Sequence, residues 1–246
     1  MAESLSLRIA HLYAHFLNIY GDRGNIITLV QRARWRGIDV TVDAIGVEQD
    51  FDPQYYDLFF VGGGQDKQQQ VIAGDLQRLS KTMHSAINGG AVILAVCGGY
   101  QLLGHYYRPA TGDELKGISL IDATTVAGNR RMIGNVVVQR KNGDTLVGFE
   151  NHSGRTFLGN DVEALGTVST GNGNNGEDKL EGAAQVVGKG KVYGTYLHGS
   201  LLPKNPRLAD ELLQLAINRR HGSVTLQTLD DSLESLAHEN ALRFRA

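Results

Sequence analysis

The stretch AVILAVCGGYQLLG, residues 91–104, decides the fold class. Its first six residues are all apolar, as expected of a central strand that helices cover on both faces. Cys97 follows directly, and the glycines after it permit a tight turn into a helix. A buried strand, a turn and a helix in this order are typical of a parallel α/β sheet, whose ligands bind beyond the carboxyl ends of the strands. Cys97 is expected at such an end.

The residues before this stretch alternate short apolar runs with longer amphipathic ones. The short runs are predicted strands, at residues 7–12, 40–45 and 58–61. The longer runs are predicted helices, at residues 24–36 and 72–87, where apolar side chains recur every three or four positions. Strands that alternate with helices in this way form a doubly wound sheet with helices on both faces. We therefore expect a three-layer, mostly parallel α/β fold.

The pattern changes after residue 110, where shorter strand-like runs follow one another. These predicted strands lie at residues 133–139, 145–149, 184–187 and 192–197, and they favour an antiparallel extension of the sheet. Helices are expected again from about 205, where Asn205 and Pro206 supply a cap and a first-turn proline. No Pro-rich or Ser-rich linker separates these parts, so residues 1–246 are expected to form a single domain.

The composition restricts the functional classes. The 24 basic and 26 acidic residues give a net charge of -2 and no basic block, so nucleic acid is not an expected partner. No run approaches the roughly 20 apolar residues that span a bilayer, and the amino end lacks an export signal. We therefore expect a cytoplasmic protein that does not span the membrane. A single cysteine in such a chain is either an inert core residue or a nucleophile.

The position of Cys97 favours a nucleophile. A tight turn between a strand and a helix is typical of a nucleophile elbow, and the small Gly99 lets the backbone reverse without a clash. Unpaired N–H groups and the dipole at the start of the helix would stabilise a thiolate there. The alternative is a small buried side chain at the end of a core strand, since free cysteines are often buried.

The residues around the cysteine resemble a known family. AVCGGYQ, residues 95–101, resembles the G-x-C-x-G-x-Q signature of class I glutamine amidotransferases, with Ala95 in place of the first glycine. The form C-G-G-Y-Q-x-L-G is similar to the branch that contains cobyric acid synthase. GTYLHG, residues 194–199, resembles the segment that carries the catalytic histidine of that branch. The resemblance implies a flavodoxin-like fold, a Cys97 nucleophile and a His198 base.

The same resemblance implies how glutamine is held. The loop GGGQD, residues 62–66, follows the third predicted strand, and we expect the N–H groups of Gly64 and Gly98 to form the oxyanion hole. The other expected substrate contacts are Gly63, Gln101 and Arg131. A guanidinium can bind the α-carboxylate of glutamine through two hydrogen bonds. The alternative for Arg131 is a solvated side chain beside Arg130.

One position departs from the family pattern. Class I amidotransferases commonly have a glutamate two residues after the histidine, where it orients the imidazole, but this chain has Ser200. The cysteine and histidine therefore either work without a carboxylate or obtain one from elsewhere, including from a partner chain. The roles of four further polar residues stay open at this point: Asp22, which could also be a helix cap, Arg23, His152 and Arg155.

Three Gly-rich polar segments, residues 18–25, 148–156 and 171–178, extend the resemblance over nearly the whole chain. They are similar to the glutaminase subunits (GatD) of lipid II isoglutaminyl synthases. This implies a heterodimer with a Mur-ligase-like subunit (MurT) that uses ammonia from L-glutamine to convert the D-glutamate α-carboxylate of lipid II to D-isoglutamine, a step in cell wall biosynthesis. The alternatives are a glutaminase for corrinoid amidation, as in cobyric acid synthase, and a non-catalytic binding module.

Cofactors are expected on the partner. The sequence has no P-loop of the G-x-x-x-x-G-K-[ST] type and no cluster of metal-ligating residues. We therefore expect no cofactor in this chain, and ATP and Mg²⁺ on the Mur-ligase-like subunit, which also binds lipid II.

Overall fold

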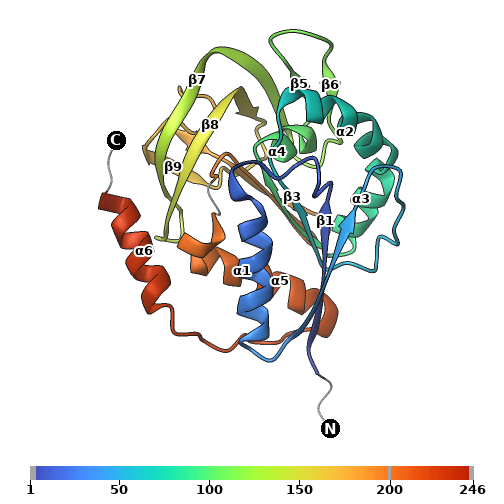
Figure 1. Ribbon diagram of the computed structural model, residues 1–246, viewed down its shortest axis with the longest axis vertical. Helices are drawn as coiled ribbons and strands as arrows, with labels where there is room; N and C mark the ends of the chain where they lie inside the picture. The colour runs from blue at the N-terminus through green and yellow to red at the C-terminus, as the bar shows by residue number, and fades with distance from the viewer. Residues whose placement is uncertain (1–3, 199–200, 244–246) are drawn as a thin grey trace.

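The computed structural model describes residues 4–198 and 201–243. Within these ranges the strands form two sheets, and the larger has the order β11-β12-β4-β3-β1-β2 (Figure 1). Its neighbouring strands are parallel, except that β11 runs antiparallel to β12. The strands are β1 (Ser6–Leu12), β2 (Asp39–Ile45), β3 (Leu58–Val61), β4 (Val92–Val96), β11 (Ala183–Val187) and β12 (Gly190–Thr195). The prediction of a mostly parallel α/β sheet is confirmed.

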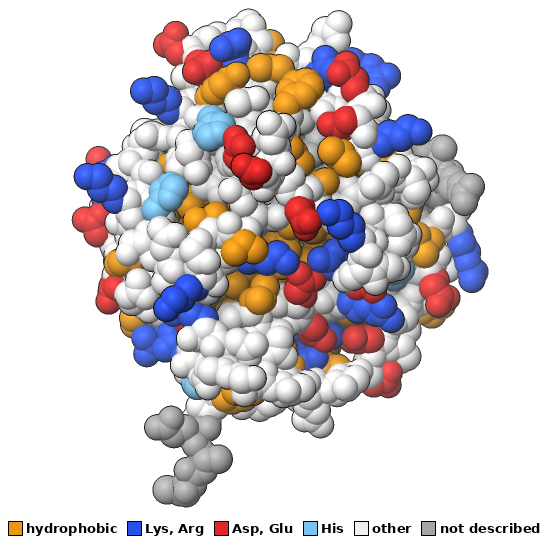
Figure 2. Space-filling view, turned by 180° about the vertical axis from the view of Figure 1, so that it is seen from behind, with side chains coloured by type: hydrophobic (Ala, Val, Ile, Leu, Met, Phe, Trp, Pro, Cys, Tyr) orange, Lys and Arg blue, Asp and Glu red, His pale blue; other side chains and the backbone are white. Residues whose placement is uncertain are grey.

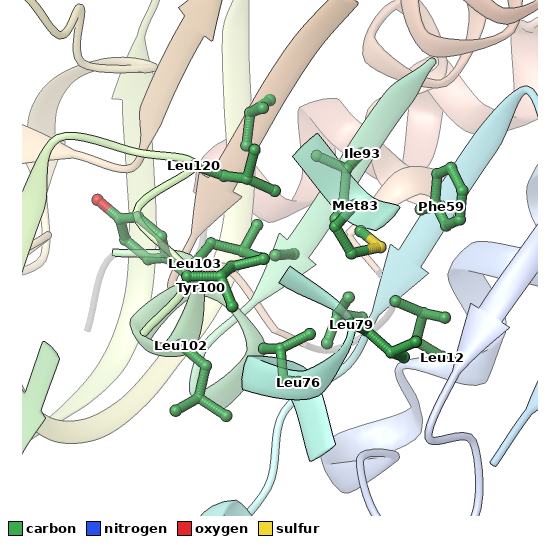
Figure 3. Packing of buried hydrophobic residues seen from close by; sticks show 14 of the residues in the cluster. Leu12, Phe59, Leu76, Leu79, Met83, Ile93, Tyr100, Leu102, Leu103 and Leu120 are labelled. Carbon is green, nitrogen blue, oxygen red and sulfur yellow. The ribbon is translucent and has the colours of Figure 1, made fainter. Parts of the chain in front are cut away.

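Helices cover both faces of this sheet. On one face lie α1 (Arg23–Arg34) and α5 (Pro206–His221), and on the other lie α2 (Asp66–Arg78), α3 (Ser80–Asn88) and α4 (Gly98–Leu103). Alternate side chains of β4 point to opposite faces: Val92, Leu94 and Val96 pack with α1 and α5, whereas Ile93 and Ala95 pack with the other three helices. Figure 3 shows Ile93 among the side chains of α2, α3 and α4. Two covered faces explain why this strand is apolar throughout.

The apolar stripe at residues 72–87, predicted as one helix, belongs to two. α2 ends at Arg78, Leu79 has φ −80° and ψ −2°, and α3 starts at Ser80. The N–H of Leu79 donates to the carbonyl of Asp75, and the N–H of Met83 donates to the carbonyl of Leu79. These bonds keep the helical spacing across the break, so the periodicity cannot reveal it.

The second sheet has the order β10-β9-β7-β5-β6, with β8 paired to β7. Its strands are β5 (Tyr106–Arg108), β6 (Leu115–Lys116), β7 (Ala123–Gln139), β8 (Thr145–Leu158), β9 (Gly166–Thr170) and β10 (Leu180–Glu181). The runs at 133–139 and 145–149 therefore lie in this sheet, not in an extension of the larger one. The run at 192–197 enters the larger sheet parallel to β4. An alternating pattern identifies a strand with one buried face, but not the sheet that it joins.

Two short 3-10 helices, η1 (Ile19–Gly21) and η2 (Leu202–Lys204), and the helix α6 (Ser232–Arg243) are the other helical elements. α5 begins at Pro206 as expected, but the side chain of Asn205 does not cap it. Its Oδ1 accepts from the N–H of Val147 and its Nδ2 donates to the carbonyl of Val147, so it ties the helix start to β8. Among the helices described, none combines the length and apolar composition needed to span a bilayer.

Candidate active site

Cys97 lies in the tight turn between β4 and α4, with φ 49° and ψ −106°. Positive φ strains the backbone of a residue other than glycine, and such strain persists only where the surroundings fix the backbone. Gly99 provides part of that constraint, because a Cβ there would lie 2.8 Å from the carbonyl oxygen of Gly62. The backbone of α4 therefore packs directly against the turn after β3. This geometry is that of the predicted nucleophile elbow, with the cysteine partly exposed.

His198 and Asp22 lie together behind the cysteine, and both side chains are fully buried. The Nδ1 of His198 is 3.5 Å from Oδ1 of Asp22, while Oδ2 of Asp22 accepts a 2.6 Å hydrogen bond from the N–H of Gly63. A Cβ on Gly63 would lie 2.9 Å from Cε1 of His198 and 3.3 Å from Cβ of Cys97. Gly63 is thus the point around which the thiol, the imidazole and the carboxylate converge.

Backbone pairing with the second sheet fixes the position of His198. Its N–H donates to the carbonyl of Phe149 at 2.7 Å, and the N–H of Phe149 donates back to its carbonyl at 3.3 Å. His198 follows β12, so it stands at the carboxyl edge of the larger sheet next to Cys97, which follows β4. Both sheets therefore contribute to the position of His198.

The charges around His198 favour its protonated form. Burial alone would lower the pKa of His198, but the negative charges of Cys97 and Asp22 outweigh burial and raise this pKa to about 10. An imidazolium beside a thiolate is the state in which the sulfur is nucleophilic and the ring can give a proton to a leaving group.

The Gly64 and Gly98 turns lie against each other, because a Cβ on Gly98 would be 3.0 Å from the backbone nitrogen of Gly64. In the described part of the chain, neither of these two N–H groups donates to a protein acceptor. Such unpaired donors next to Cys97 suit an oxyanion hole. Gly63 differs, because its N–H is donated to Asp22 and its carbonyl accepts from Ile19. The backbone of Gly63 therefore supports the carboxylate, and its expected contact with glutamine stays a prediction.

A cavity of about 340 Å³ opens above the cysteine, within the usual size of small-molecule sites. Cys97, Gly64, Gln101 and Arg131 line it together with Ile19, Gln65, Asp66, Lys67, Gln69, Tyr107, Asn151, His152, Ser153 and Gly154. Nε of Arg131 donates to Oδ1 of Asn151 at 2.6 Å, from β7 across to β8, which holds the guanidinium at the cavity. Four of the seven predicted site residues thus share one cavity.

The amide of Gln101 is engaged at both ends by protein groups. Its Oε1 accepts from Nε2 of Gln69 at 2.6 Å, and its Nε2 donates to the hydroxyl of Tyr196 at 3.1 Å. Gln69 also donates to the carbonyl of Gly98. The sequence-based prediction did not include Gln69, which is buried and links the first turn of α4 to α2. Gln101 therefore supports the turn at Cys97 through these hydrogen bonds. A direct contact between Gln101 and glutamine stays a prediction.

The residues whose roles the sequence left open fall in different places. His152 lines the cavity, stacks on Tyr196 with ring centroids 3.6 Å apart, and lies 3.8 Å from the buried carboxylate of Glu150. Arg155 pairs with Glu177 outside the cavity. Ser200 lies outside the described residues. Over the ranges that are described, no group of three or more His, Cys, Asp or Glu side chains is suited to hold a metal ion.

The fold and this site agree with the comparison to known families. Residues 8–206 match the model of the CobB/CobQ-like glutamine amidotransferase domain, and the chain belongs to this family of glutamine amidotransferases. The prediction of a glutamine amidotransferase of the cobyric-acid-synthase-like branch is confirmed.

Within the family, two relatives of one kind are similar over nearly the whole chain. The chain is 42% identical to the lipid II isoglutaminyl synthase (glutamine-hydrolyzing) subunit GatD of Streptococcus pneumoniae, over 95% of this chain and 90% of that protein. It is 39% identical to the subunit of the same name from Staphylococcus aureus, over 95% and 93%. The cobyric acid synthase of Limosilactobacillus reuteri is 31% identical over 58% of this chain and 29% of that protein.

Proposed function

We propose that this chain is the glutamine-hydrolysing subunit of a lipid II isoglutaminyl synthase. It releases ammonia from L-glutamine for a Mur-ligase-like partner (MurT), which amidates the D-glutamate α-carboxylate of lipid II to D-isoglutamine during cell wall biosynthesis. The observation that carries the proposal is the similarity to two GatD subunits over 95% of the chain. Corrinoid amidation has less support, because the cobyric acid synthase match covers 58% of the chain.

The cluster at the carboxyl edge of the larger sheet suits the first half of the reaction. The Cys97 thiolate attacks the γ-amide carbon of glutamine, and the N–H groups of Gly64 and Gly98 stabilise the negative charge that grows on the carbonyl oxygen. Arg131 holds the α-carboxylate at the far end of the cavity. The His198 imidazolium then protonates the nitrogen as the C–N bond breaks, which releases ammonia and leaves a γ-glutamyl thioester.

His198 becomes neutral in that step and serves as the base of the second half. It takes a proton from a water molecule that attacks the thioester, and glutamate leaves as the Cys97 thiolate is restored. The carboxylate 3.5 Å from Nδ1 of the ring keeps the imidazole oriented and stabilises its charged form. Asp22 thereby takes the part that the family gives to a glutamate at the position of Ser200.

The amidation half belongs to the partner in this proposal. ATP and Mg²⁺ bind to the Mur-ligase-like subunit, where the carboxylate of lipid II is activated before it meets ammonia. The proposal locates the heterodimer in the cytoplasm, because the partner consumes ATP there.

The proposal is tested with the purified heterodimer of this chain and its Mur-ligase-like partner. Lipid II, ATP and either glutamine or an ammonium salt are supplied, and the amidated product is measured by mass spectrometry. The wild-type complex is expected to use both nitrogen sources, whereas the Cys97→Ala complex is expected to use only the ammonium salt. Glutamine-dependent product from the Cys97→Ala complex, or its absence from the wild-type complex, would overturn the proposal.

A further inference from the structure

A second cavity, of about 610 Å³, lies between α1 and the strands β1 and β2, outside the candidate active site. Figure 1 shows α1 standing beside these strands. The lining residues are His11, Ala14, His15, Asn18, Arg23, Ile26, Ile27, Val30, Gln31, Arg34, Val42 and Ala44. Those from α1 recur every three or four positions, so one side of the helix forms a wall of the cavity along its whole length.

The charge of this cavity is one-sided. Its lining has two arginines and two histidines but no aspartate or glutamate. Within the ranges described, the guanidinium groups of Arg23 and Arg34 form no hydrogen bond or ion pair, whereas Arg32 of the same helix and Arg36 in the turn after it bind Asp210. On the opposite side of the molecule, positive and negative side chains are interspersed (Figure 2). The cavity therefore offers two cations that this part of the chain leaves uncompensated.

His11 adds a buried polar group to the lining. It is 6% exposed, and its Nε2 has no hydrogen-bond partner among the described residues. Burial lowers the pKa of His11 to about 4, despite the opposing charge of Asp22, so the ring is neutral in the cell. His11 therefore adds a neutral imidazole to the wall of the cavity, and the charge of the lining comes from its arginines.

The shape of the cavity fits a polypeptide. β2 is the last strand of the larger sheet, so its outer edge is unpaired within the described chain, and such edges bind extended segments. Ile27 and Val42, which are 58% and 38% exposed, give the cavity an apolar wall. From Arg23 to Arg34 the helix rises about 16 Å. That is the length of about five extended residues.

We infer that this cavity docks an acidic, extended segment of the partner subunit, whose carboxylates bind Arg23 and Arg34 and whose apolar side chains pack on Ile27 and Val42. The inference rests on the proposed function, because it requires a partner subunit. It assigns the α1–β2 cavity to the assembly of the enzyme, whereas the Cys97 cavity binds glutamine.

Calorimetric titration of the chain with its purified partner subunit tests the inference. Arg23→Glu and Arg34→Glu are each expected to weaken binding about tenfold, and Ile27→Asp to weaken it as well, because all three place negative charge against an acidic segment. The matched control is Lys81→Glu, a charge reversal of an exposed residue on α3 at the opposite face of the sheet, which should bind like the wild-type chain. Thermal unfolding of each variant checks that the fold is kept.

The outcomes separate the inference from the proposed function. Equal affinities for all four variants and the wild-type chain would show that the partner docks elsewhere and would overturn the inference alone. Binding of free glutamate in this cavity, lost in Arg34→Glu while partner affinity is kept, would assign it to a small carboxylate and also overturn the inference. Failure of the wild-type chain to bind any Mur-ligase-like partner would overturn the proposed function together with the inference.

Discussion

The two sheets divide the candidate site between them. The larger sheet supplies Cys97 and His198 at its carboxyl edge, where the fully buried carboxylate of Asp22 lies 3.5 Å from the ring of His198. The second sheet supplies Arg131 and Asn151 from a long hairpin, where they line the cavity above Cys97. In the proposed mechanism, the imidazole and the carboxylate that stabilises its charge are fully buried, whereas the side chain that binds the α-carboxylate of glutamine lines the open cavity.

This division has a kinetic meaning. A change in the buried cluster should lower kcat, because those groups act on the reacting amide. A change in the hairpin should raise KM, because those groups bind glutamine equally before and during the reaction. The following changes test that contrast, from the largest expected effect to the smallest.

The largest loss is expected from removal of the imidazole. His198→Asn should lower kcat for glutamine hydrolysis by more than about 10⁴-fold, because it removes both the proton donor for ammonia and the base for the water. Release of glutamate is the measurement. His105→Asn is the matched control, since His105 is exposed and pairs with Asp122 away from the cavity. Full activity of His198→Asn would contradict the assignment.

Asp22→Asn should lower kcat by about 1000-fold, because a neutral amide no longer stabilises the imidazolium. It should also change the pH dependence. The raised pKa of His198 keeps the ring protonated until the pH rises towards about 10. Loss of the carboxylate lowers that pKa, so activity on the alkaline side should be lost at a lower pH in the variant. Profiles of kcat against pH that end at the same alkaline limit in both proteins would refute this role of Asp22.

Gly63→Ala should lower kcat by about 100-fold, since even a small displacement of catalytic groups is costly. The added Cβ would lie 2.9 Å from Cε1 of His198 and 3.2 Å from Oδ2 of Asp22, so one of the two must move. Gly74→Ala is the matched control, because a Cβ in that part of α2 meets no atom within 4 Å. The control should keep its activity. It should also unfold at a higher temperature, because alanine in place of glycine stabilises a helix by about 1 kcal/mol. Equal kcat for both variants would contradict the crowding at Gly63.

The smallest effect is expected in the second sheet. Arg131→Ala should raise KM for glutamine about 30-fold and leave kcat within a few-fold, because the α-carboxylate loses its charged partner but the γ-amide still meets Cys97. Steady-state kinetics separate the two constants. Arg130→Ala is the control, as Arg130 binds Asn172 instead of facing the cavity. A fall in kcat with unchanged KM would contradict a binding role for Arg131, because it would show that Arg131 acts on the reacting amide.

Much of the site could be read from local patterns. The apolar run 92–96, the glycines after Cys97 and the glycine turn 62–64 each express a short-range backbone requirement, and the structure has them as expected. The third polar group was not readable in this way. Asp22 follows β1 in a polar turn that resembles an ordinary helix start, and only its hydrogen bond to Gly63 and its distance to His198 reveal a second use.

The sequence by itself determined the parallel α/β core, the nucleophile elbow and the strand end that carries His198, because these depend on apolar periodicity and on glycines within a few residues of one another. The tertiary structure alone decided which strands after residue 110 build the second sheet (β6 to β10) and which join the larger one (β11 and β12). It also decided that the backbone of Phe149 holds His198 and that Asp22 lies beside its ring. The reason is that contacts between distant segments depend on the order in which strands pair. The local pattern of a strand does not specify which other strand lies beside it.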